Sequence, residues 1–202
     1  MEFSVAVQEH FAQWADRRGT RGAIGELTGI LASGKADPER YHEIVARDGL
    51  EREIWFRKDR LDLVLGYVES ALETGSLDRE RQRDISALKE WLDIAEGDFA
   101  RYRPSEVSAI LQKQLELILA DLRVDEAEDV YQVVLQTAFD LGYDQYLAFP
   151  RVTLERAWAE LSTLSETAGS RPSTDHLQSR RAALEPLYRL AIAQPRTLGD
   201  LY

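Results

Sequence analysis

The spacing of hydrophobic residues along the chain is helical from one end to the other. Apolar residues recur every three or four positions, as in the stripe of Val7, Phe11 and Trp14, and this period is typical of an amphipathic helix. Val, Ile and Thr do not gather in the alternating runs that indicate strands. The sequence therefore predicts an all-α helical bundle. Helices are expected at about 3–17, 21–33, 38–47, 50–74, 78–93, 104–121, 125–140, 150–166 and 175–193.

Local start and stop signals support several of these boundaries. Asp37 followed by Pro38 has the pattern of a helix N-cap with proline at the first helical position. Pro104 stands at a similar place in the first turn of its helix. We expect Gly97 and Gly142 to take the left-handed backbone conformation that commonly follows a helix.

The middle of the chain contains a repeat with a period of 47 residues. Residues 68–99 align with residues 115–146 without a gap, and apolar positions match apolar positions. The residue pattern of each copy predicts a helix, a tight polar turn that ends in Asp, and a second helix. Because one copy cannot bury its apolar stripe alone, we expect the two copies to pack together as a core. The identical pairs are Glu69/Glu116, Leu72/Leu119, Asp78/Asp125, Leu88/Leu135 and Asp93/Asp140.

The turn of the second copy resembles a known family. Residues 118–128 (Ile-Leu-Ala-Asp-Leu-Arg-Val-Asp-Glu-Ala-Glu) are similar to the recurring signature of the TerB-like (tellurite-resistance B) family. In that signature a helix ends in Ala-Asp-Gly, a hydrophobic-Asp pair follows, and an acid starts the next helix. Residues 72–80 form a more diverged version. Leu122 replaces the glycine of the signature, and Thr74 replaces its acid in the first copy. The resemblance implies an acidic, internally duplicated helical bundle.

The resemblance also defines a predicted domain organisation. Residues 166–175 are rich in Gly, Ser, Thr and Pro and are typical of an exposed linker, and Pro186 is expected to interrupt the last helix. We interpret that helix as a lid or as an oligomerisation arm. The second interpretation predicts a homo-oligomer. The predicted parts are N-terminal helices packing on the core (1–59), the TerB-like core (60–148), a helix completing the bundle (149–167), and the linker with the C-terminal helix (168–202).

Acidic residues at the two turns are the candidate metal ligands. The resemblance implies that they bind a divalent cation, and it reaches Asp78, Asp121, Asp125 and Glu128. Closely spaced carboxylates suit Ca²⁺ or Mg²⁺. However, Asp125 and Glu128 also have the spacing of a capping box, in which both side chains bond to the backbone of the first helical turn. Both interpretations remain open, and Asp78 has the same alternative.

Composition and charge restrict the classes of partner that the protein is expected to bind. The net charge of −11 opposes binding to nucleic acid or to anionic membranes. No apolar run approaches the roughly 20 residues that cross a bilayer, the first residues do not form a signal peptide, and cysteine is absent. We therefore expect a cytoplasmic protein that binds protein partners. The resemblance adds a bacterial stress or phage-defence setting.

Sequence motifs that indicate catalysis are absent or incomplete. The chain contains no nucleophile elbow and no glycine-rich phosphate loop. Glu39 and His42 have the E-x-x-H spacing of di-iron carboxylate bundles, but such a site needs two copies of this motif. We therefore predict a non-enzymatic interaction or regulatory module. The alternative is a metal-dependent helical-bundle enzyme that uses Glu39, His42 and nearby carboxylates.

Overall fold

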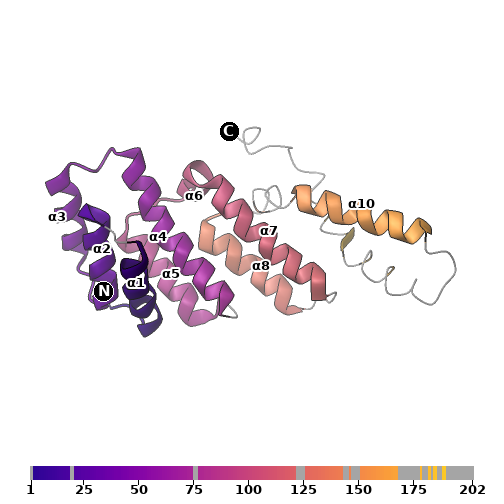
Figure 1. Ribbon diagram of the computed structural model, residues 1–202, viewed down its shortest axis with the longest axis horizontal. Helices are drawn as coiled ribbons and strands as arrows, with labels where there is room; N and C mark the ends of the chain where they lie inside the picture. The colour runs from indigo at the N-terminus through magenta and orange to yellow at the C-terminus, as the bar shows by residue number, and fades with distance from the viewer. Residues whose placement is uncertain are drawn as a thin grey trace. The chain divides into compact units, whose positions relative to one another are not determined.

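A computed structural model describes most of the chain (Figure 1). The described residues are 2–18, 21–74, 77–121, 126–142, 146, 151–167 and the single positions 178, 182, 184, 185, 188 and 189. Within these ranges the regular elements are helices, and a single isolated bridge joins Glu2 to Lys35. The all-α prediction is confirmed. The helices are α1 (Val5–Arg18), α2 (Gly22–Ser33), α3 (Pro38–Asp48), α4 (Ile54–Glu73), α5 (Arg79–Trp91), α6 (Asp98–Tyr102), α7 (Pro104–Asp121), α8 (Glu126–Phe139) and α10 (Arg151–Thr167).

The chain divides into two compact units, Met1–Pro104 and Ser105–Tyr202. The predicted core of residues 60–148 spans this division, so its two copies belong to different units. Their packing against each other stays a prediction. Among the described residues, no helix is both long and apolar enough to span a membrane.

The first unit is built around α4. This helix packs against α1, α2, α5 and α6, while α3 packs on α2. Because neighbours surround α4, its apolar residues are not confined to one stripe, and buried side chains occur on successive positions from Leu63 to Leu65. The largest fully buried side chains of this unit are Phe11, Leu27, Leu31, Ile44, Phe56, Leu61, Leu63, Ile85, Leu88, Leu92 and Phe99.

The helix α3 begins and ends as its sequence predicts. The Asp37 carboxylate accepts a hydrogen bond from the Glu39 backbone N–H at 3.0 Å, and Pro38 occupies the first helical position. Gly49 ends the helix with φ of 66°, a left-handed conformation that glycine adopts without steric cost. These caps fix the direction in which α3 presents its residues to α4.

The period of 47 residues is also present in the backbone. The helix α5 of the first copy corresponds to α8 of the second. Both helices close on a left-handed aspartate, since φ is 51° at Asp93 and 52° at Asp140. The next residue then bonds back in the same way in both copies, from Ile94 N to Lys89 O at 3.0 Å and from Leu141 N to Gln136 O at 2.9 Å. The second helix of each copy therefore ends with the same turn.

These aspartates correct one expectation. Gly97 does have a positive φ of 82°, but it stands before α6 and not at the end of α5. The residues that close the two repeat helices are Asp93 and Asp140. Aspartate tolerates the left-handed conformation better than most residues because its short side chain bonds to the local backbone. Glycine is therefore not required at these two turns.

We expect the positive φ to govern substitutions at Asp140. Asp140→Ala should lower the free energy of unfolding by about 1 kcal/mol, because a Cβ without a polar group disfavours this conformation. Asp140→Gly should lose nothing or gain a few tenths of a kcal/mol, since glycine adopts positive φ freely. Urea unfolding of both variants measures the difference. An equal loss in the two variants would show that the carboxylate matters and the backbone conformation does not.

The described part of the second unit includes α7, α8 and α10. Leu154 and Leu161 of α10 form a small buried cluster with Leu184, and Trp158 packs against it. The Trp158 and Tyr188 rings stack with centroids 4.8 Å apart. The linker was predicted at residues 166–175, but α10 extends through residues 166 and 167. The rest of the predicted linker and most of the predicted last helix, with Pro186, lie outside the described residues.

Candidate functional site

The structure describes the side chain of only one of the four predicted metal ligands, Asp78. The Asp78 side chain caps α5, because its carboxylate accepts a hydrogen bond from the Arg81 backbone N–H at 2.9 Å. It also lies 3.5 Å from the Arg81 guanidinium. Asp121 and Glu128 lie in α7 and α8, but their side chains and the whole of Asp125 are outside the described residues. Among the side chains that are described, no group of three His, Asp or Glu residues could hold a metal ion. The cation site stays a prediction.

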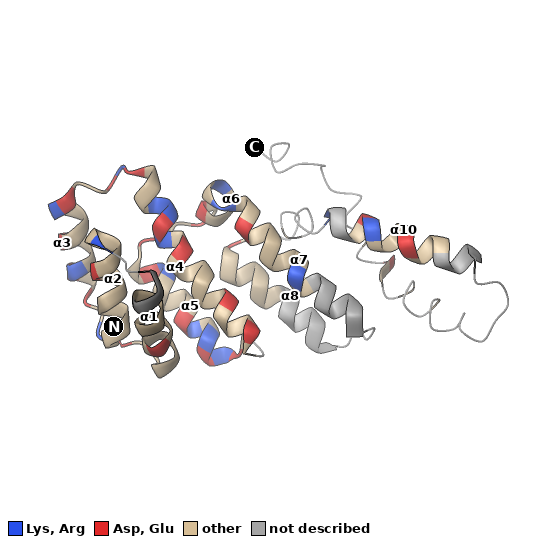
Figure 2. Cartoon of the chain, in the orientation of Figure 1, with Lys and Arg blue, Asp and Glu red and all other residues tan. Residues whose placement is uncertain are grey.

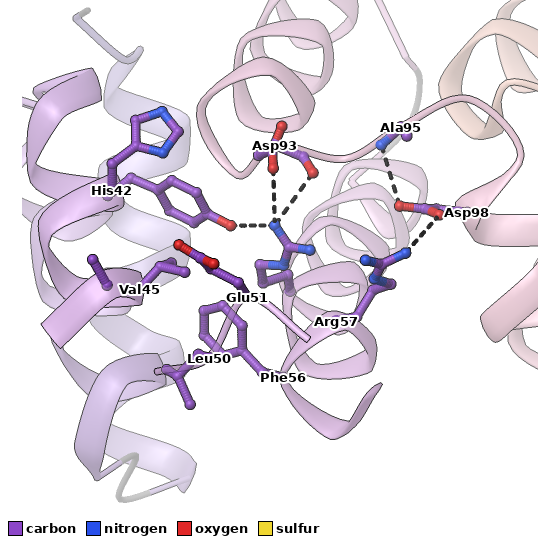
Figure 3. A pocket seen from close by; sticks show the side chains of 12 residues that line it. His42, Val45, Leu50, Glu51, Phe56, Arg57, Asp93, Ala95 and Asp98 are labelled. Carbon is purple, nitrogen blue, oxygen red and sulfur yellow. Dashed lines mark hydrogen bonds and ion pairs between the residues drawn. The ribbon is translucent and has the colours of Figure 1, made fainter. Parts of the chain in front are cut away.

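A cavity of about 420 Å³ lies in the first unit (Figure 3). Its walls come from α3, from the segment between α3 and α4, from the first turns of α4, from the segment between α5 and α6, and from the first residue of α6. His42 lines this cavity, whereas its predicted partner Glu39 does not. The complete lining is Tyr41, His42, Val45, Ala46, Leu50, Glu51, Phe56, Arg57, Arg60, Asp93, Ala95 and Asp98.

Arg60 is the most buried charged group of the cavity, with 6% of its surface exposed. Its Nη1 atom donates hydrogen bonds to the Tyr41 hydroxyl, to the Leu92 carbonyl at 2.6 Å and to the Asp93 carbonyl at 3.2 Å. The guanidinium also lies over the Phe56 ring, 5.3 Å from its centroid. Arg60 therefore ties α3 and α4 to the end of α5.

The charge of Arg60 is only loosely balanced. The nearest carboxylate that pairs with it belongs to Asp93, at 3.9 Å, and that side chain is 76% exposed. At this distance the pair makes no direct hydrogen bond. Burial raises the pKa of the neighbouring Tyr41, so its hydroxyl stays protonated and adds no negative charge beside Arg60.

Arg57 lies one helical turn before Arg60 and is more accessible. Its side chain is 36% exposed, and its Nη1 atom lies 3.9 Å from the Asp98 carboxylate and 3.3 Å from the Tyr102 hydroxyl. The other carboxylate oxygen of Asp98 accepts a hydrogen bond from the Ala95 backbone N–H at 3.2 Å. Arg57 and Asp98 thus form a second loose ion pair at the cavity wall.

The remaining lining combines exposed polar groups with an apolar surface. Glu51 and His42 are both exposed, while Val45 and Phe56 are buried. Figure 3 shows His42 and Val45 on the side formed by α3, and Arg57 with Asp98 on the opposite side. The cavity can therefore contact charged groups of both signs and an apolar group at once.

The arginines and acids of this cavity were not predicted as site residues from the sequence. The usable signal is Arg60, which stands four residues after Phe56 and four before Val64 on the buried side of α4. A charged residue at such a position is rarely left without partners. Its partners could not be identified in advance, because they are 19 to 33 residues away along the chain.

The start of α4 also exposes two large apolar side chains. Ile54 is 61% exposed and Trp55 is 50% exposed. The Trp55 ring contacts Phe56, which lines the cavity, with ring centroids 5.8 Å apart. Basic and acidic residues are interspersed over the helices of this unit (Figure 2). We call Ile54 and Trp55 the α4 apolar step.

Comparison of the chain with protein-family models, with curated proteins and with solved structures gave no match. The similarity to TerB-like domains, over roughly residues 60–148, therefore rests on the segments 72–80 and 118–128 and stays a prediction.

Proposed function

We propose that this chain is a non-enzymatic, acidic helical module that binds a basic partner protein through the α4 apolar step. The observation that carries the proposal is the exposure of Ile54 and Trp55, at consecutive positions on a helix whose other large apolar residues are mostly buried. Tryptophan is among the residues that contribute most to protein interfaces, because its large ring buries much surface at low entropic cost.

Buried contacts next to the α4 apolar step favour a rigid binding surface on this chain. Phe56, directly after Trp55, is 1% exposed and packs under the Arg60 guanidinium. The backbone that presents the two exposed residues is thus held by buried contacts. A partner would not have to order this part of the chain on binding, which reduces the entropic cost of association.

Charge supports a basic partner. The chain carries a net charge of −11, and such a field accelerates encounter with a positively charged protein. The TerB-like resemblance supports the same class of module. A divalent cation at the second repeat, a bacterial stress or defence setting and a cytoplasmic location come with it as parts of this proposal.

Site-specific crosslinking tests the proposal. A photoreactive benzoylphenylalanine replaces Trp55 in cells that naturally express the chain, and a second strain carries it at Val133, another exposed apolar position at 60% exposure. We expect a discrete crosslinked product from position 55 only, whose second component is identified by mass spectrometry and has a high isoelectric point. Equal products at both positions, or none at position 55, would contradict the proposal.

A further inference from the structure

The cavity beneath α3 and α4 is lined by both charge signs and by an apolar wall. We propose that it binds a small zwitterion of the amino-acid class that carries an apolar side chain. This site is distinct from the α4 apolar step and does not depend on partner binding.

The arginines provide the contact for the ligand's carboxylate. The Arg57 side chain is 36% exposed, and its ion-pair partner Asp98 lies at 3.9 Å, beyond hydrogen-bond distance. Arg60 adds a second positive charge one turn further along the same helix. A carboxylate within hydrogen-bond distance of Arg57 would form a charge-assisted bond that the protein itself does not make there.

The acids provide the contact for the ligand's ammonium group. Three carboxylates line the cavity, from Glu51, Asp93 and Asp98, against two guanidinium groups. Asp98 is buried and accepts a backbone hydrogen bond, whereas Glu51 and Asp93 are exposed. An ammonium group near these two carboxylates would offset the excess negative charge of the lining.

The residues that line the cavity disfavour a free anion or a metal ion as the ligand. A free anion would face the repulsion of three carboxylates, and a metal ion lacks a suitable cluster of His, Asp or Glu among the described residues. The volume of about 420 Å³ is that of a pocket for a small organic molecule. Val45, Leu50 and Phe56 form the apolar part of the wall, where an aliphatic or aromatic side chain would be removed from water.

Three matched probes separate the two charges of the ligand. L-phenylalanine carries both, 3-phenylpropanoate lacks the ammonium group, and 2-phenylethylamine lacks the carboxylate. Calorimetric titration of the full chain should show binding of L-phenylalanine, with each single-charge analogue about tenfold weaker or worse, as expected for loss of one charged hydrogen bond. No binding of L-phenylalanine, or equal affinity for all three probes, would overturn the proposal.

Two variants assign the contacts. Arg57→Gln should reduce the affinity for L-phenylalanine to that of 2-phenylethylamine, and Glu51→Gln should reduce it to that of 3-phenylpropanoate. Arg83→Gln, at an exposed position of α5 outside the cavity, serves as the matched control and should bind normally. Unchanged affinity in both cavity variants, with circular dichroism showing intact folding, would place the ligand elsewhere and overturn the assignment.

Discussion

Replacing Arg60 with alanine is expected to lower the free energy of unfolding by about 3 kcal/mol or more. The substitution leaves the buried Tyr41 hydroxyl and the carbonyls of Leu92 and Asp93 without their donor. It also removes the side chain that packs over Phe56. Because three separate segments meet at this guanidinium, the loss cannot be repaired by a small local shift.

Urea unfolding followed by tryptophan fluorescence measures this effect. Arg60→Lys keeps the charge but provides a single-point donor in place of a planar fork, so we expect it to recover only part of the stability. Arg101→Ala is the matched control, because Arg101 also lies over an aromatic ring, that of Tyr102, but is exposed. It should change the stability by less than about 0.5 kcal/mol. A similarly small effect at Arg60 would show that the guanidinium does not hold the segments together.

Asp84→Ala is expected to have the second largest effect, a loss of about 2–4 kcal/mol. Asp84 is 6% exposed, and one of its oxygens accepts hydrogen bonds from the Ser4 and Tyr67 hydroxyls, both at 2.6 Å. Burial raises the pKa of Tyr67, and its bond to Asp84 raises it further, so the hydroxyl remains a donor. The variant would leave the buried Tyr67 hydroxyl without its acceptor and would release Ser4 from α5.

Asp84→Asn separates the hydrogen bonds from the charge. Its amide oxygen can still accept from both hydroxyls, so thermal unfolding should show less than half of the loss caused by alanine. If both variants lose the same stability, the negative charge of Asp84 is what stabilises the fold, and its two hydrogen bonds are secondary.

Much of the fold follows from local sequence signals. The helical period, the Asp37-Pro38 start and the 47-residue repeat predict the long helices to within about four residues of their observed ends. The short helix α6 was not predicted, because five residues are too few to show a period. After the two repeat helices α5 and α8, glycines were expected in the left-handed turns, whereas Asp93 and Asp140 occupy them. Local preference thus identifies where a helix ends better than which residue closes it.

The cavity could not be predicted in the same way. Its lining joins residues from Tyr41 to Asp98, and their proximity depends on how α3, α4 and the end of α5 pack. Sequence spacing paired His42 with Glu39 as a possible site, whereas only His42 lines the cavity. Periodicity places residues on a face of one helix. It does not show which faces of distant helices meet.

The central claim, that the α4 apolar step binds a basic protein, is tested most directly with the crosslinked partner in purified form. Its dissociation constant is measured for the unchanged chain, for Trp55→Ser and for Val133→Ser, at low and at high salt. We predict that Trp55→Ser weakens binding about 30-fold, the value for a tryptophan that contributes about 2 kcal/mol. Val133→Ser should bind normally, and salt should weaken the unchanged complex. Equal affinity of the two serine variants, or binding indifferent to salt, would contradict the claim.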